Sequence, residues 1–167
     1  MAVRCDIVGL LEEVQTILET ANTITASPID LSANLTTRIN KVLKVHPERI
    51  RPQASFFPLV TMFISSKPVV TQDIANSQLQ ATRRSKINLS IVGSIWNTNI
   101  TSVDEDPADE DVQYLMENIE LALRGNPTFN AKVAWQAPTD VKYYITLMSE
   151  KTHLRSGILN YECEMFY

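Results

Sequence analysis

Two stretches of the chain carry apolar residues at the spacing of one face of an α-helix, and this periodicity constrains the fold more than any other feature. The first set is Ile7, Leu10, Leu11, Val14, Ile17 and Leu18, and the second is Val112, Leu115, Met116, Ile119, Ala122 and Leu123. Offsets of three and four residues place such side chains on one stripe. The sequence therefore predicts two amphipathic helices, each with one face to bury.

Both predicted helices have residues suited to their ends. Asp6 precedes the first helix and can accept hydrogen bonds from its free backbone amides. Asp106 and Pro107 suit the start of the second helix, and Gly125 followed by Asn126-Pro127 suits its end. The second helix is therefore expected to stop close to Gly125.

Five segments have the composition or the alternation of β-strands. They are Phe57–Ser65, Ile87–Trp96, Asn130–Gln136, Val141–Met148 and Leu159–Tyr167. Because the last three are joined by short polar turns, an antiparallel arrangement is expected. The predicted fold is a single α+β domain spanning residues 1–167, with a mostly antiparallel β-sheet packed by two amphipathic helices and with long polar loops.

Two connections are longer than a compact domain requires. The connection Asn22–Phe56 contains one periodic stretch, Leu35 to Leu43, which favours a short helix over a strand near Val45. The connection Ser66–Ser85 separates two strands that we expect to be neighbours, where a hairpin would use two to five residues. Connections of this length are often functional.

Composition and charge exclude several classes of protein. A hydrophobic share of 44% and a net charge of −4 fit a folded protein without a field that would attract nucleic acid. No apolar run approaches the ~20 residues that span a bilayer, and the N-terminal residues lack the pattern of a signal peptide. Cys5 and Cys163 have neither metal spacing nor a redox motif, so we expect buried thiols in a reducing compartment.

Residues that could carry catalysis are few and scattered. His46 and His153 are predicted to lie in exposed loops, and neither has a partner at metal-ligand spacing. A pair between Cys163 and His153 could form in space, but the alternation near the C-terminus points Cys163 into the core. The four glycines match no phosphate-binding pattern. We therefore expect no active site, no cofactor and no metal site, in a protein that is not an enzyme.

Charged and aromatic residues outside the predicted core are candidates for a subunit interface. The acidic run lacks the glycine and the distant glutamate of a calcium loop and is typical of a solvated helix start. The compact basic group is either solvated or meets such an acidic segment of a neighbouring subunit. The candidates are Arg83, Arg84, Lys86, Asp104, Glu105, Asp106, Trp96 and Tyr144.

The order of elements and three local segments resemble the tail terminator and tail-completion (neck) proteins of long-tailed bacteriophages. Phe57-Pro58-Leu59-Val60-Thr61-Met62-Phe63-Ile64 is similar to the family's proline followed by a strand. Asp106-Pro107-Ala108-Asp109-Glu110-Asp111, leading into Val112 to Leu123, is similar to its central helix. Gly157 through Tyr161-Glu162-Cys163-Glu164-Met165-Phe166-Tyr167 is similar to its closing strand.

The resemblance implies a structural virion protein, made in the host cytoplasm, that forms a closed ring. Such a ring is commonly a hexamer that caps the tail tube and joins it to the head–tail connector, with DNA only passing through its lumen. The long Asn22–Phe56 connection departs from the compact version of the family. The alternative is a small cytoplasmic enzyme or ligand-binding domain with a site built from loop residues such as His46, Arg49, Arg51 and His153. A nucleic-acid-binding accessory protein that uses Arg83 and Arg84 is a third hypothesis.

Overall fold

The computed structural model describes residues 6–21, 39–67, 84–97, 107–149 and 152–166. Two helices, two single-turn 3₁₀ helices and five strands lie in these ranges. In chain order they are α1 (Ile7–Ala21), β1 (Lys41–Leu43), η1 (Pro47–Arg49), η2 (Ala54–Phe56), β2 (Leu59–Ser66), β3 (Arg84–Asn97), α2 (Pro107–Arg124), β4 (Trp135–Ser149) and β5 (Thr152–Phe166).

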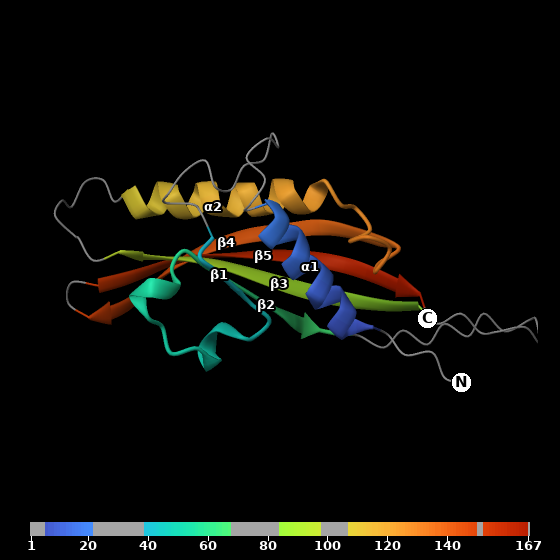
Figure 1. Ribbon diagram of the computed structural model, residues 1–167, viewed down its shortest axis with the longest axis horizontal. Helices are drawn as coiled ribbons and strands as arrows, with labels where there is room; N and C mark the ends of the chain where they lie inside the picture. Colours follow the sequence, from blue (N-terminus) through green and yellow to red (C-terminus); the bar gives the residue numbers. More distant parts are fainter. Residues whose placement is uncertain (1–5, 22–38, 68–83, 98–106, 150–151, 167) are drawn as a thin grey trace, which may run out of the picture.

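The five strands form one sheet in the order β1-β2-β3-β5-β4. Only the β1–β2 pair is parallel, and the other three pairs are antiparallel. Both helices lie on the same side of this sheet, with α2 running along the strands and α1 crossing beside it (Figure 1). The prediction of an α+β fold with a mostly antiparallel sheet and two helices is confirmed.

Both helices begin and end close to where the sequence predicts. Asp6 accepts a hydrogen bond from the Gly9 amide at 2.9 Å, which confirms its capping role. Helix α2 ends at Arg124, and the Gly125 amide donates to the Leu121 carbonyl. Asp106 lies outside the described residues.

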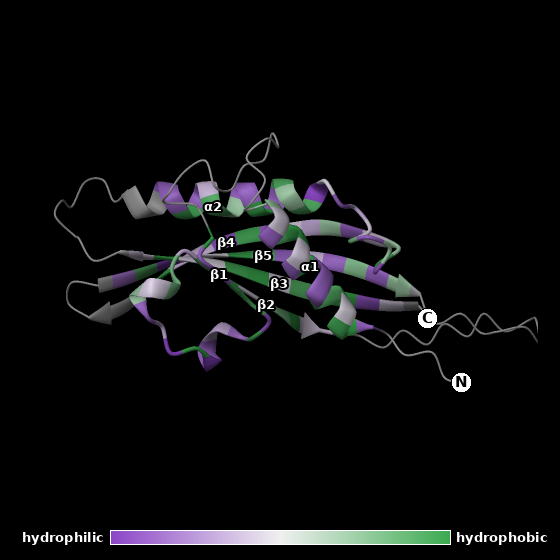
Figure 2. Cartoon of the chain, viewed as in Figure 1, coloured by the Kyte–Doolittle hydropathy of each residue, from purple (hydrophilic) through white to green (hydrophobic). Residues whose placement is uncertain are grey.

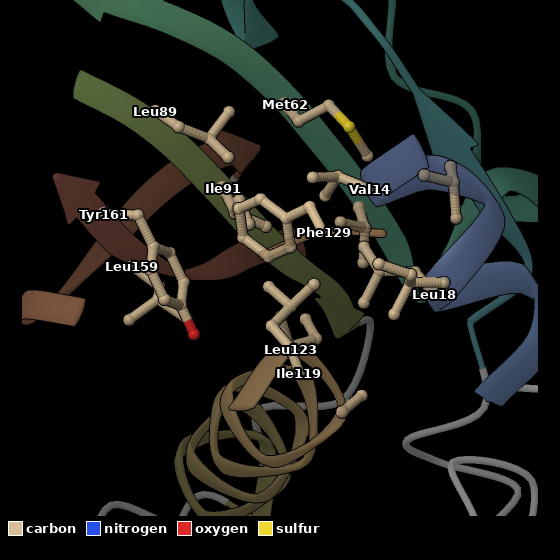
Figure 3. Packing of buried hydrophobic residues seen from close by; sticks show 14 of the residues in the cluster. Val14, Leu18, Met62, Leu89, Ile91, Ile119, Leu123, Phe129, Leu159 and Tyr161 are labelled. Carbon is tan, nitrogen blue, oxygen red and sulfur yellow. The ribbon is translucent and has the colours of Figure 1, made fainter. Parts of the chain in front are cut away.

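The core lies between the helices and one face of the sheet. Hydrophobic and hydrophilic residues alternate along the strands in Figure 2, so each strand offers one apolar face. In Figure 3, side chains from both helices converge with those of β2, β3 and β5 around the ring of Phe129. The labelled members of this cluster are Val14, Leu18, Met62, Leu89, Ile91, Ile119, Leu123, Phe129, Leu159 and Tyr161, all buried.

Two of the four glycines bring α2 close to the sheet. Gly93 of β3 and Gly157 of β5 are direct partners in the antiparallel register. A Cβ atom on Gly93 would lie 2.6 Å from the sulfur of Met116, and one on Gly157 would meet Met116 Cγ. Met116 therefore fills the space that two side chains would otherwise occupy, and the spacing between α2 and the sheet depends on it.

The predicted strand Asn130–Gln136 is wrong over most of its length. Phe129, Asn130 and Ala131 have φ angles of 43°, 50° and 66°, so the chain makes a left-handed turn before β4 begins at Trp135. Phe129 is buried because this turn folds it inward, and not because it alternates in a strand. The last part of the sheet therefore contains two strands of 15 residues each instead of three short ones.

The predicted helix over Leu35–Leu43 is also wrong at its C-terminal end. Lys41, Val42 and Leu43 form β1 and pair with the start of β2. Pairing with an existing strand outweighs the weak helical spacing of so short a segment. The expectation that β2 and β3 are neighbours is confirmed, while residues 68–83 between them lie outside the described part of the chain.

Candidate binding groove and sheet edge

A groove of about 680 Å³ crosses the sheet face that the helices leave uncovered. Alternation along the strands places one set of residues toward the helices and the other toward this second face. The lining combines residues from four strands with residues from the segment around η1. They are His46, Pro47, Glu48, Pro52, Phe63, Val92, Ser94, Tyr144, Thr146, Leu154, Ser156 and Ile158.

The floor of the groove is formed by β3 and β5. Ser94 and Ser156 are both buried, and their hydroxyl oxygens lie 2.8 Å apart in a hydrogen bond. Val92 is buried beside them, and Ile158 pairs with it across the two strands. The floor is thus apolar around one pair of hydroxyl groups that are hydrogen-bonded to each other. It can therefore contact an apolar group without leaving a buried polar atom unpaired.

One wall of the groove is formed by His46 and Phe63. Their ring centroids are 4.3 Å apart at an angle of 54°. The His46 Nδ1 atom accepts a hydrogen bond from the Glu48 amide at 3.3 Å. The two rings give this wall an aromatic surface, and Pro47, Glu48 and Pro52 also line the groove.

The opposite wall comes from β4, the last strand of the sheet. Tyr144 and Thr146 lie there, facing Ser156 and Leu154 of β5. Burial raises the pKa of the Tyr144 phenol, and a hydrogen bond with Ser156 lowers it in part. Tyr144 is therefore a neutral polar group at the point where the groove reaches the sheet edge.

Those predicted interface residues that the structure describes do not gather at one place. Lys86 forms an ion pair of 2.6 Å with Glu162 across β3 and β5, on the second sheet face. Trp96 packs on Phe57, the residue that follows η2, with ring centroids 5.4 Å apart. Arg84 begins β3. Arg83, Asp104, Glu105 and Asp106 lie outside the described residues.

The residues of the alternative loop-built site are not brought together either. His153 lies within β5, not in a turn as predicted, because β5 begins at Thr152. It does not line the groove, and neither does Arg49 or Arg51. His153 and Cys163 are ten residues apart on one extended strand, a separation of about 33 Å. The Cys163–His153 pair is therefore excluded, and Cys163 is a free, buried thiol as predicted.

Metal binding and membrane crossing find no support in the described residues. Within those ranges, no three His, Cys, Asp or Glu side chains are grouped so that they could hold a metal ion. Of the two described helices, neither is long and apolar enough to cross a membrane.

The groove and the sheet edge could be found only in part from the sequence. Val92 is an apolar residue on the otherwise mostly polar face of β3, which indicates a second buried surface. Leu154 and Ile158 were missed because the last strand was predicted to start at Leu159. The position of β4 at the edge depends on strand order, which the sequence does not reveal.

Comparisons with known proteins leave the family open. Neither a protein-family model nor a curated protein matches the chain. Among solved structures, the chain is similar to the type 4 fimbrial biogenesis protein PilO from Pseudomonas aeruginosa, at 10% identity and a TM-score of 0.27. The match covers 99% of this chain and 73% of that one. A similarity of this size supports no inference about fold or function.

Proposed function

We propose that the protein is a structural subunit of a bacteriophage virion that assembles with copies of itself into a ring at the tail end or the head–tail joint. There it terminates the tail tube and joins it to the neck. The proposal rests on the resemblance of Phe57–Ile64, Asp106–Asp111 and Gly157–Tyr167 to tail terminator proteins, together with a fold of the expected class.

One surface feature carries the preference for an assembly protein. Large apolar side chains are exposed on β4, an edge strand of 15 residues. Trp135 is 48% exposed, Tyr143 47%, Tyr144 37% and Ile145 59%. A long edge strand with exposed aromatic and aliphatic residues invites pairing with another chain. Such an edge fits a protein whose working form is an oligomer.

A ring requires two different surfaces that meet head to tail. The sheet has two different edges, the long β4 and the short β1, on opposite sides of the molecule. The partners that follow from the proposal are further copies of this chain, six being the expected number. The tail tube protein and the head–tail connector bind the finished ring, and DNA only passes through.

Native mass spectrometry of the purified protein, alone and mixed with tail tubes, tests this function. We expect a hexamer, or a monomer that becomes hexameric on the tubes, and electron microscopy should then show rings at tube ends. A protein that stays monomeric and leaves tube growth unchanged contradicts the proposal. Tubes incubated with bovine serum albumin serve as the control for nonspecific capping.

The groove favours a second function from another class, a ligand-binding domain. Its volume of about 680 Å³ lies within the usual range for small-molecule sites, and its lining is mostly apolar with a few polar groups. Thermal-shift screening with neutral, largely apolar compounds tests this candidate. A compound that raises the melting temperature of the parent protein, but not of a Val92→Arg variant, supports it, whereas equal shifts in both contradict it.

A further inference from the structure

We propose that neighbouring subunits join their sheets edge to edge, with β4 of one copy pairing antiparallel with β1 of the next. The contact is centred on Lys142–Tyr144 and on Lys41–Leu43 of the neighbouring copy. This inference rests on the proposed ring and names the surface and the partner that build it: a second copy of this chain, through strand addition.

The two halves of β4 differ in how they are protected against strand addition. The first half contains Pro138, a register irregularity between Pro138 and Asp140, and the charges of Asp140 and Lys142, which form an ion pair of 3.2 Å. Proline, bulges and charges are the devices that keep edge strands from pairing. From Tyr143 to Leu147 the strand has neither proline nor charge, and its pairing with β5 has no register shift until the one between Leu147 and Ser149. The second half is therefore the part of the edge that is open to a partner.

Among the described strands, β1 is the other edge of the sheet, and it lies at the level of this open half. Paired residues of neighbouring strands form rows that cross all five strands at right angles to the strand direction. One such row consists of Val42, Val60, Gly93, Gly157 and Tyr143. Of the two adjacent rows, one has Lys41 and Tyr144 as its end residues, and the other has Leu43 and Lys142. A neighbour displaced sideways along these rows brings β1 to Lys142–Tyr144, where the open half of β4 begins.

The strand directions and faces also agree with this contact. β1 is parallel to β2, and three antiparallel steps separate β2 from β4, so β1 and β4 run in opposite directions. In a ring whose axis runs along the strands, the rotation that relates one copy to the next leaves the direction of every strand unchanged. The new pair of β4 and the neighbouring β1 is therefore antiparallel. Val42 and Tyr143 both lie on the helix-covered face. Val42 is buried there, and the pKa of Tyr143 is raised by burial and by Glu117 and Glu120 of α2.

The contact also extends the wall of the groove at the β4 edge. Tyr144 and Thr146 form the wall at the β4 edge, and the neighbouring Lys41 and Leu43 face the same side of the joined sheet. Leu43 would add an apolar side chain beside that wall. Main-chain pairing is confined to the three residues of β1, so these side-chain contacts set the position of the neighbour.

Cysteine cross-linking tests the pairing in the full chain. In a background with Cys5→Ser, a variant with Lys41→Cys and Tyr144→Cys is assembled and treated with a short bismaleimide that tolerates a register shift of two residues. Lys41 is exposed and Tyr144 partly so, and the native mass of the untreated variant checks that it still assembles. We expect a ladder of covalent oligomers up to the full ring, because each copy links to the next through two different sites.

Two controls separate this pairing from its competitors. Lys41→Cys with Trp135→Cys moves one thiol nine residues along β4, about 30 Å away, and should give no ladder. Tyr144→Cys alone should give no cross-link, whereas dimers from it mean that β4 pairs with β4 and overturn the inference. Rings that form normally but give no ladder with Lys41→Cys and Tyr144→Cys also overturn it and leave the proposed function standing. A protein that never assembles refutes both.

Discussion

Replacing Ala131 by glycine should stabilise the protein, because Ala131 is the third of three consecutive residues in the left-handed region. Its φ is 66°, after 43° at Phe129 and 50° at Asn130. A left-handed conformation costs a residue with a Cβ atom about 1–2 kcal/mol. Glycine avoids this cost but loses about 0.5–1 kcal/mol more backbone entropy on folding. The free energy of unfolding should therefore rise by about 0.5–1 kcal/mol.

Chemical denaturation and thermal unfolding measure this change. For a chain of this size the melting temperature should rise by about 1–4 °C. Ala134→Gly is the matched control, because Ala134 is exposed, has no positive φ and donates its amide to the Glu164 carbonyl at 2.8 Å. That variant should be less stable by about 0.5–1 kcal/mol. If both variants lose the same stability, the left-handed turn at Phe129–Ala131 is wrong.

Four further predictions concern the core, the pH dependence, the buried thiol and the sheet edge. Gly157→Ala should destabilise the fold by about 1–3 kcal/mol in chemical denaturation, because the new Cβ meets Met116, and the loss should shrink in a Met116→Ala background. The pKa of Asp6 lies below its usual 3.8, through a hydrogen bond from the Gly9 amide and the nearby Lys132 ammonium. The stability that this carboxylate contributes is therefore present above pH 3.8 and is lost as pH falls through its lowered pKa. In Asp6→Asn the melting temperature should accordingly fall less between about pH 5 and pH 1. Burial raises the pKa of the Cys163 thiol to about 12, so peptide mapping should find it unlabelled by a thiol reagent at neutral pH until denaturant is added. Ile145→Lys places a charge on the open half of β4 and should weaken assembly by roughly tenfold or more in native mass titrations, with an unchanged melting temperature.

The helices could be predicted because their information is local. Offsets of three and four residues define α1 and α2, and Asp6 and Gly125 mark an end of each. The alternation from Ile87 to Trp96 likewise predicts β3 almost to its ends. These features depend on residues within a few positions of one another, so a single sequence contains all that is needed.

The candidate surfaces could not be predicted in the same way. The strand Asn130–Gln136 was wrong because a buried Phe129 looks the same in a sequence whether a strand or a turn buries it. The segment Lys41–Leu43 became a strand because β2 was there to pair with it. The groove combines His46, Val92 and Tyr144, which only the sheet brings together.

By itself, the sequence determined the class of the fold, the two helices and the inward direction of Cys163, because periodicity fixes which side of an element is apolar. Only the tertiary structure decided that β4 and β1 are the edges of the sheet, that their open segments lie at one level, and that a groove crosses the second face. Strand order and register depend on contacts between residues far apart in the chain, and periodicity within one strand is the same at the centre of a sheet and at its edge.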